Sequence, residues 1–273
     1  MNANRKMLSA VFCAITTGSV FSATITVPGT SDPWLAGMTN GATASGGDFA
    51  PAQSPAEVVG MQVFPAEFLL FSASGTVANK AGLTRFGPEG NTNGVLPHRE
   101  GAENGISSCR APINSLLGVF LGPDLPSLTP APATLDFGAQ TARDYANLSP
   151  ALKQVFFIGD GHTSSGLIQS ITVPSGATRL FLGSMDGFTW FDNVGAFIVT
   201  VAPVPRLSIR VIDSSRSSIS WPTNAADYSL EYTTDLPAVA WIATTNSAVV
   251  EGDQIVVTVS EMFHQQFFRL RRH

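Results

Sequence analysis

Short apolar runs, each ended by Gly, Pro or Asp, follow one another along most of the chain. The run at 155–158 stops at Gly159-Asp160-Gly161, and 167–173 alternates apolar and polar residues before Pro174. Runs of this length and alternation are typical of strands joined by turns. The pattern predicts further strands at 24–27, 58–64, 68–71, 115–121, 179–182 and 196–201, and one short helix over 145–153. We therefore expect an all-β sandwich of the jelly-roll type over residues 23–202.

A second unit is predicted after a proline-rich connector. Two prolines in Ala202-Pro-Val-Pro205 favour a stiff, extended linker at 203–206. Six short strands are then predicted at 207–212, 218–221, 228–232, 241–242, 255–259 and 267–270. They indicate a small β-sandwich over 207–273, with Trp221, Leu230 and Trp241 in its core.

The N-terminal segment 1–22 has the pattern of an export signal. Arg5 and Lys6 precede an uncharged apolar stretch at 8–20, and Ser22 supplies a small residue at the expected cleavage point. The stretch is too short to favour a membrane-spanning helix, so we expect no transmembrane segment. A secreted, extracellular or cell-surface protein is predicted. A buried first strand and an uncleaved anchor are the alternatives.

Composition and motifs exclude several classes of function. Only 13% of the residues are charged and the net charge is −5, which argues against a nucleic-acid partner. Removal of the signal leaves Cys109 as a lone cysteine, interpreted as a buried inert thiol. Asp160-Gly-His162 is interpreted as a turn, because Asp-Gly is a strong turn signal. No nucleophile elbow, zinc-protease motif or phosphate-binding loop is present, so we expect no enzyme.

One loop carries the oxygen-rich side chains that a hard cation prefers. Asp186, Asp192 and Asn193 lie close together in the sequence between two apolar runs. Ca²⁺ takes six to eight oxygen ligands from carboxylates, amides and backbone carbonyls. Phe188 and Trp190 interrupt the polar residues, and an exposed aromatic ring beside calcium suits the apolar face of a sugar. The alternative is a simple turn, in which Asp and Asn bond their own backbone.

Residues 62–201 resemble the small calcium-dependent galactose-binding bacterial lectins of the LecA type. The resemblance rests on Phe71-Ser-Ala-Ser-Gly75, Phe86-Gly-Pro-Glu-Gly90, Asn114-Ser-Leu-Leu-Gly118 and the stretch from Asp186 to Phe197, in that order. It implies a galactose-binding-like jelly roll.

The resemblance also implies a set of ligand and sugar-contact residues. Calcium would be held by the side chains of Asp186, Asp192 and Asn193, and by backbone carbonyls of Thr189 and a residue near Asn79. Sugar contacts are implied for Asp186, Thr189, Trp190, Asp192 and His98.

This chain departs from the lectin pattern in two places. Its loop is slightly shorter, with Asp192 in place of an Asn, which adds negative charge and favours a cation. The family's His-Pro-x-Gln sugar motif is missing, because Leu96-Pro-His-Arg-Glu100 does not match its spacing. Galactose itself is therefore not implied, and His98 is equally well interpreted as a solvated loop residue.

Two broader resemblances concern the whole chain. The segments 27–37, 156–161 and 174–183 resemble exported bacterial proteins associated with PEP-CTERM surface sorting, although no C-terminal apolar anchor follows. The last third resembles fibronectin type III-like modules that end in Phe-Phe-Arg-Leu.

Two functional hypotheses follow. The first is an exported, calcium-dependent carbohydrate-binding protein whose partner is a glycan or polysaccharide. The second is a non-catalytic structural or adhesive surface protein without a sugar site. The sequence predicts neither the sugar nor the oligomeric state.

Overall fold

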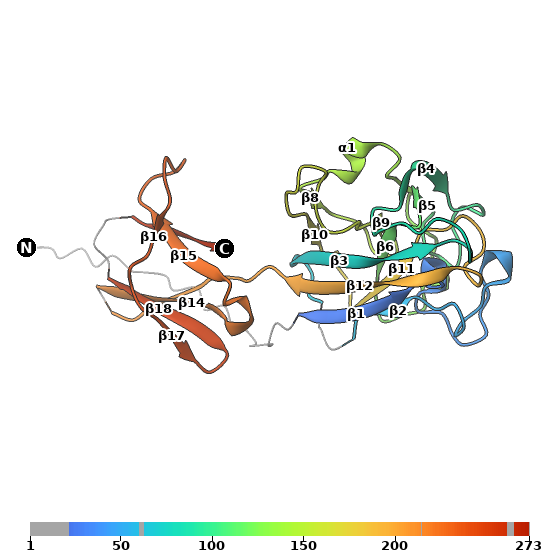
Figure 1. The fold of residues 1–273 in the computed structure, drawn as a ribbon. Coiled ribbons are helices and arrows are strands. Elements are labelled where there is room, and N and C mark those ends of the chain that lie inside the picture. Colours follow the sequence, from blue (N-terminus) through green and yellow to red (C-terminus); the bar gives the residue numbers. More distant parts are fainter. Residues whose placement is uncertain (1–21, 60–62, 214, 261–264, 273) are drawn as a thin grey trace, which may run out of the picture.

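The structure is a computed structural model that describes residues 22–59, 63–213, 215–260 and 265–272. Residues 1–21 of the predicted export signal, which include Arg5 and Lys6, lie outside the described residues. Strands make up most of the regular structure (Figure 1), which confirms the predicted all-β fold. The strands are β1 (Ala23–Pro28), β2 (Ala56–Glu57), β3 (Phe68–Ala78), β4 (Asn91–Pro97), β5 (Cys109–Ile113), β6 (Leu116–Leu121), β7 (Leu135–Asp136), β8 (Asn147–Leu148), β9 (Val155–Phe157), β10 (Ser170–Thr172), β11 (Arg179–Ser184), β12 (Val194–Pro203), β13 (Ser208–Val211), β14 (Arg216–Pro222), β15 (Tyr228–Thr233), β16 (Ile242–Ala243), β17 (Ala248–Glu251), β18 (Gln254–Ser260) and β19 (Phe267–Arg272).

The helical segments are all short. One α-helix, α1 (Gln140–Arg143), is accompanied by the 3-10 turns η1 (Pro33–Leu35), η2 (Ser45–Gly47), η3 (Pro126–Leu128) and η4 (Thr223–Ala225). The helix predicted over 145–153 is wrong: Asn147 and Leu148 form β8, which pairs in parallel with β10. Pairing with a neighbouring strand has overridden the local helix signal there. Among the described residues, none of these helices is long and apolar enough to span a bilayer.

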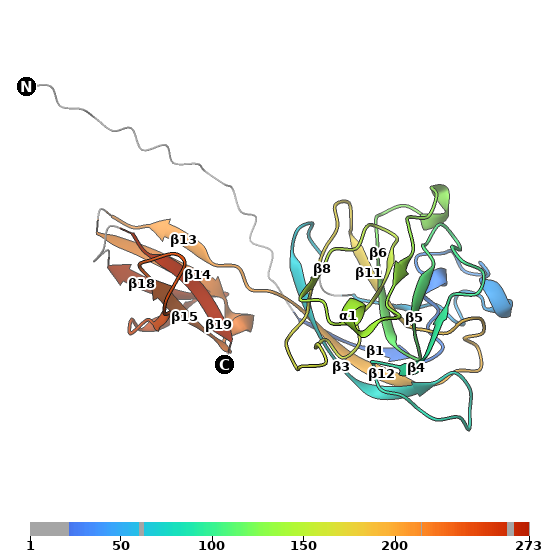
Figure 2. The same ribbon diagram turned by 90° about the horizontal axis from the view of Figure 1, so that it is seen from above.

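Two sheets form the sandwich of the N-terminal part. The five-stranded sheet has the order β1-β12-β3-β10-β8, and the four-stranded sheet has the order β2-β11-β6-β9. A small third sheet, β4-β5-β7, completes this part. Figures 1 and 2 show β1, β12 and β3 running side by side along the domain. Only the pairs β8–β10 and β5–β7 are parallel among the described strands.

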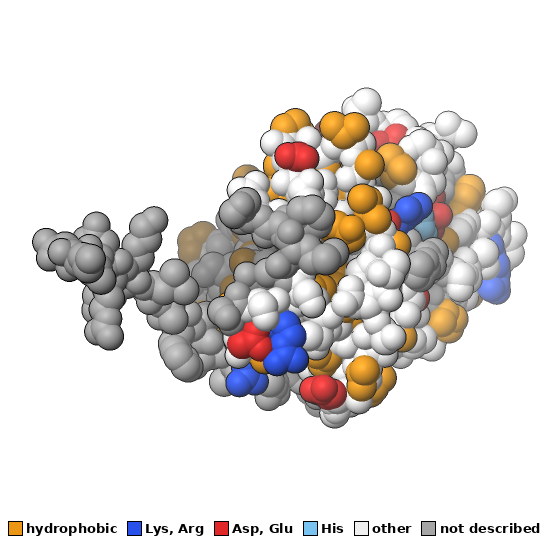
Figure 3. All heavy atoms as spheres, turned by 90° about the vertical axis from the view of Figure 1, so that its left-hand side faces the viewer, with side chains coloured by type: hydrophobic (Ala, Val, Ile, Leu, Met, Phe, Trp, Pro, Cys, Tyr) orange, Lys and Arg blue, Asp and Glu red, His pale blue; other side chains and the backbone are white. Residues whose placement is uncertain are grey.

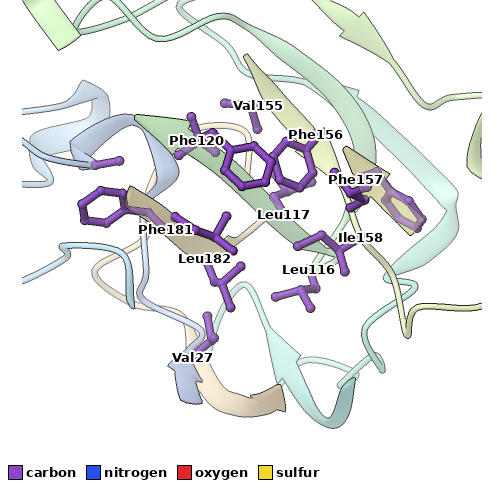
Figure 4. Close-up of a cluster of buried hydrophobic side chains, with 14 of the residues drawn as sticks. Val27, Leu116, Leu117, Phe120, Val155, Phe156, Phe157, Ile158, Phe181 and Leu182 are labelled. Atoms are coloured by element: carbon purple, nitrogen blue, oxygen red, sulfur yellow. The ribbon is translucent and has the colours of Figure 1, made fainter. Parts of the chain in front are cut away.

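The core between the two sheets is apolar and continuous. All six residues of β6 are buried, as expected for a strand covered on both faces. The rings of Phe120 and Phe156 stack with centroids 5.2 Å apart, and Figure 4 shows them beside Leu117 and Val155. Each fully buried side chain of this size contributes roughly 1.5–3 kcal/mol to folding. The core therefore fixes the positions of β11 and β6, and with them the start of the loop that follows β11.

The C-terminal part has its own core. Its sheets have the orders β13-β14-β18-β17 and β16-β15-β19. Trp221 and Leu230 are buried, as predicted, together with Ile219 and Val257. Trp241 does not belong to this core: it is half-buried, and the Arg269 guanidinium lies 4.4 Å from its ring centroid. The cation holds the ring at the surface of the module.

The connector between the two parts begins slightly later than predicted. β12 runs through Pro203, and the Val204 N–H still donates to the Phe68 carbonyl at 2.7 Å. β13 then begins at Ser208. Seen from the end of the molecule that lies to the left in Figure 1, the surface has scattered hydrophobic side chains among mostly uncharged ones (Figure 3).

Gly118 tests the packing of the sandwich core. A Cβ on Gly118 would meet the Phe156 ring at 2.7 Å and Ile158 Cδ1 at 3.0 Å. We expect Gly118→Ala to lower the free energy of unfolding by about 1–3 kcal/mol, because an overpacked core must shift. Gly87→Ala is the matched control, since a Cβ there meets nothing within 4 Å. Equal stability of the two variants in urea unfolding would contradict this packing.

Candidate functional site

The predicted loop connects the two sheets at one end of the sandwich. It follows β11 of the four-stranded sheet and leads into β12 of the five-stranded sheet. Within it, the Asn193 N–H donates to the Trp190 carbonyl at 3.1 Å. The loop therefore closes on itself just before β12 starts.

The three predicted side-chain ligands share one property. Asp186 and Asn193 are buried and Asp192 is half-buried. Each has a buried oxygen without a hydrogen-bond partner: Oδ2 of Asp186, Oδ1 of Asp192 and Oδ1 of Asn193. A buried polar atom left unpaired costs roughly 1–3 kcal/mol, and more if it is charged. The loop thus presents three oxygens that need a partner.

Hydrogen bonds fix the remaining polar side-chain atoms of Asp186 and Asn193. Asn193 Nδ2 donates to the Gly29 carbonyl at 2.9 Å, and Ser184 Oγ donates to the same carbonyl at 2.6 Å. The Gly187 N–H donates to Asp186 Oδ1 at 2.6 Å. In each of Asp186 and Asn193, one polar atom anchors the side chain and the other is left free. The unpartnered oxygens of Asp186 and Asn193 are therefore held in fixed directions.

The electrostatics of Asp186 fit a site that lacks a positive charge. Burial raises the pKa of Asp186 to about 6, and the negative charge of Asp192 acts in the same direction. The Gly187 N–H and the Asn193 amide lower that pKa in part. A carboxyl group that is hard to ionise here would ionise readily beside a cation.

Strand pairing brings Asn79 to the same end of the sandwich. Ala78, the last residue of β3, pairs with Val194, the first residue of β12. The next residues, Asn79 and Asn193, are therefore neighbours where the two strands meet the loop. Lys80 Nζ lies 3.9 Å from Asp192 Oδ2, which agrees with this placement. Asn79 is half-buried, as is Thr189 within the loop.

Trp190 does not present its ring to solvent in this structure. Its side chain is 0% exposed, and its indole N–H donates to the Ser184 carbonyl at 2.9 Å. The expectation of an exposed ring at Trp190 is therefore wrong. The neighbouring rings are the exposed ones, with Phe188 at 37% and Phe191 at 56%. A large indole fills the space under the loop, and the flanking phenyl rings turn outward.

His98 is also buried, so its interpretation as a solvated loop residue is wrong, and its ring is not open to solvent as the sugar-contact expectation assumed. Its ring stacks on Trp34 with centroids 3.7 Å apart, and its Nδ1 lies 2.6 Å from the Gly101 carbonyl. A carbonyl only accepts, so Nδ1 carries the proton. Burial lowers the pKa of His98, and its Nε2 faces Ser45 Oγ at 3.2 Å and Glu103 Oε2 at 3.4 Å. His98 therefore joins the segments around Ser45 and Glu103.

Asp48 is a site residue that the sequence analysis missed. Its Oδ1 and Oδ2 each accept the Trp190 N–H at 3.1 Å, and Oδ1 accepts the Phe191 N–H at 2.9 Å. Burial raises the pKa of Asp48. Gly46 lies against the loop, since a Cβ there would meet the Phe188 carbonyl oxygen. The Gly46-Gly47-Asp48 sequence indicates a turn, but no pattern connects it to a loop so much later in the chain.

The remaining candidates from the sequence are structural. Cys109 is fully buried, and burial raises the pKa of its thiol well above the ordinary value, as expected for an inert cysteine. Asp160 Oδ1 accepts the His162 N–H at 2.8 Å, which is the turn geometry that the sequence predicted.

Calcium fits the chemistry of the donor set. The described residues of the loop offer two carboxylates and one amide oxygen, all hard ligands, and three of these oxygens are unpartnered. Among the described ranges, no group of three or more His, Cys, Asp or Glu side chains is placed to hold a metal ion. A group of carboxylates of that kind would also suit calcium, which in addition takes amide and backbone carbonyl oxygens.

Comparison with known proteins adds no relative. No protein family matches the chain, and no curated protein matches it.

Asp186 makes the stability of the calcium-free protein dependent on pH. Burial raises the pKa of Asp186 in the folded protein to about 6. Its contribution to the free energy of unfolding is therefore most favourable at low pH and is lost as the pH rises through about 4 to 6. In chelator, we expect Asp186→Asn to be more stable than the wild type at pH 7.5, by up to about 3 kcal/mol. At pH 3.5 the difference should vanish. Chemical unfolding of both proteins at the two pH values measures this stability difference. A difference that does not change with pH would contradict the raised pKa of Asp186.

Proposed function

We propose that the protein is an exported, non-enzymatic protein that binds carbohydrate with the help of calcium. Its ion would be held by the side chains of Asp186, Asp192 and Asn193, with backbone carbonyls from Thr189 and Asn79. The observation that carries the proposal is the set of three unpartnered oxygens on the three side chains that the lectin resemblance nominates.

Charge balance supports a divalent cation. The negative charge of Asp192 raises the pKa of Asp186, and the nearby Lys80 is largely exposed and 3.9 Å from Asp192. A lysine at that distance and exposure is screened by water and contributes little. Ca²⁺ between the carboxylates would supply both the charge and the missing contacts.

The same loop offers a surface for a sugar. A bound calcium ion accepts vicinal hydroxyl groups, as in the LecA-type lectins that the sequence resembles. Phe191 precedes Asp192 directly, and its ring is exposed. Phe188 lies on the other side of Trp190, with the Arg99 guanidinium 4.2 Å from its ring centroid. We assign stacking against the sugar ring to Phe191, because the Arg99 guanidinium covers the ring of Phe188 and not that of Phe191.

Export is part of the proposal. The charged and apolar pattern of residues 1–22 supports secretion to the cell surface or medium, where calcium and polysaccharides meet. The C-terminal module then serves as a separate attachment or spacer unit.

The structural or adhesive alternative also has an observation in its favour. Three of the five implied sugar-contact residues, Asp186, Trp190 and His98, are buried. In that alternative, calcium only stabilises the loop and no sugar binds.

Calcium should stabilise the protein through this loop. A ligand that binds only the folded state adds RT ln(1 + [L]/Kd), about 4 kcal/mol at a thousandfold excess over Kd. We expect millimolar CaCl₂ to raise the melting temperature relative to chelator, and Asp192→Ala to remove the rise. Asp213→Ala, an exposed acidic residue of the C-terminal module, is the control and should keep it. A calcium response that is absent in the wild type, or unchanged in Asp192→Ala, would exclude the loop as the site.

Phe191→Ala separates sugar binding from calcium binding. We expect the variant to keep the calcium-dependent melting shift and to lose at least tenfold in retention on an immobilised polysaccharide panel that includes galactose polymers. Phe64→Ala, which removes another exposed ring, should retain both properties. If the wild type responds to calcium but binds no polysaccharide, the structural alternative replaces the lectin proposal.

A further inference from the structure

Asn114 occupies a turn directly beside the candidate loop. Its φ is 66°, and the Ser115 N–H donates to the Pro112 carbonyl at 3.1 Å across the turn. Asn is among the residues that tolerate a positive φ at the third position of such a turn. The turn explains the backbone of Asn114, but it does not use the side chain.

The side chain of Asn114 is buried without any hydrogen-bond partner. It is 1% exposed, and both Oδ1 and Nδ2 are unpartnered. Within the described part of the chain, Asn114 is the only residue with two such atoms. Burying a whole amide in this way costs several kcal/mol. Turn propensity alone would be served as well by Gly.

The backbone of Asn114 lies against the residue that precedes Asp186. The Asn114 N–H donates to the Met185 carbonyl at 2.7 Å, and the Met185 N–H donates to the Ser115 carbonyl at 2.7 Å. Asp186 follows Met185 and has its own unpartnered Oδ2. The unpartnered amide and the unpartnered carboxylate oxygen therefore belong to two segments whose backbones are hydrogen-bonded, and the two groups do not bond each other. A cation between them would give each a partner, with every ligand oxygen about 2.3–2.6 Å from the ion.

We propose that Oδ1 of Asn114 is a further ligand of the calcium ion, supplied by the turn before β6. This inference rests on the proposed function. The loop and Asn79 together provide five oxygen-bearing residues, and calcium takes six to eight oxygens, which include water and, in the proposed function, sugar hydroxyls. Asn114 brings the protein set to six, and it does so from a segment that lies far before Asp186 in the chain.

Asn114→Gly tests the role without disturbing the turn. Gly adopts a φ of 66° without strain and removes both unpartnered atoms. We expect the melting temperature in chelator to stay the same or rise. The calcium Kd, measured by isothermal titration with CaCl₂ alone, should weaken at least tenfold. A Kd equal to that of the wild type would overturn the inference.

Asn114→Asp gives an independent second readout. It keeps the size and the turn, but adds a charge beside Asp186. We expect a lower melting temperature in chelator and calcium binding at least tenfold tighter than in the wild type. Unchanged affinity would overturn the inference even if Asn114→Gly does not fold.

Asn104→Gly is the matched control. Asn104 also has a positive φ, of 52°, but its Nδ2 donates to the Trp34 and Thr43 carbonyls. The loss of these bonds should lower stability equally in calcium and in chelator, with no change in Kd. If the wild type binds no calcium, the proposed function and the role of Asn114 both fail. If Asp192→Ala abolishes binding and Asn114→Gly leaves the calcium Kd unchanged, only the role of Asn114 fails.

Discussion

The pairing of β12 between β1 and β3 determines where the candidate site lies. Ten residue pairs join β12 to β3, from Val194–Ala78 to Pro203–Leu69, and six pairs join β12 to β1. This register brings the end of β3 to the start of β12, where the loop arrives from β11 in the other sheet. Gly195 permits the close approach, because its φ is 91° and a Cβ there would meet the Thr76 carbonyl oxygen. A slip of one position in the register would turn every side chain of β12 to the opposite face.

The site collects more negative charge than its surroundings balance. The pKa of Asp32 is raised well above its ordinary value, mainly by burial, with Asp48, Glu103 and Asp186 adding to the rise. The pKa of Asp48 is raised by burial as well, with smaller contributions from Asp192 and Glu103. Buried carboxyl groups either take up a proton or find a cation. Asp48 accepts two backbone N–H groups of the loop and anchors it, and the proposed calcium ion would supply the cation.

Much of the fold could be predicted from the sequence, because apolar runs and turn residues are local signals. The runs at 115–121 and 196–201 correspond to β6 and β12, and Trp221 and Leu230 are core residues as expected. The helix over 145–153 was wrong, since pairing with β10, a strand from a later part of the chain, decides that segment. Local patterns carry no information about such pairing.

The site was predictable only in part, for a related reason. The spacing of Asp186, Asp192 and Asn193 is visible in the sequence, and all three end in unpartnered oxygens. Alternation did not reveal which of Phe188, Trp190 and Phe191 is buried, because the loop is irregular there. Asp48 and Asn114 reach the loop only through tertiary contacts. The hydrogen bonds of the Asp48 carboxylate connect it to the loop, and the buried, unpartnered amide of Asn114 is the basis for its proposed role.

The most direct test is a crystal structure of the protein grown with calcium, with anomalous scattering to identify the ion. The account predicts one calcium ion in the loop, about 2.3–2.6 Å from Asp186 Oδ2, Asp192 Oδ1 and Asn193 Oδ1. Water molecules alone at hydrogen-bond distance from these oxygens, with no anomalous peak, would contradict it.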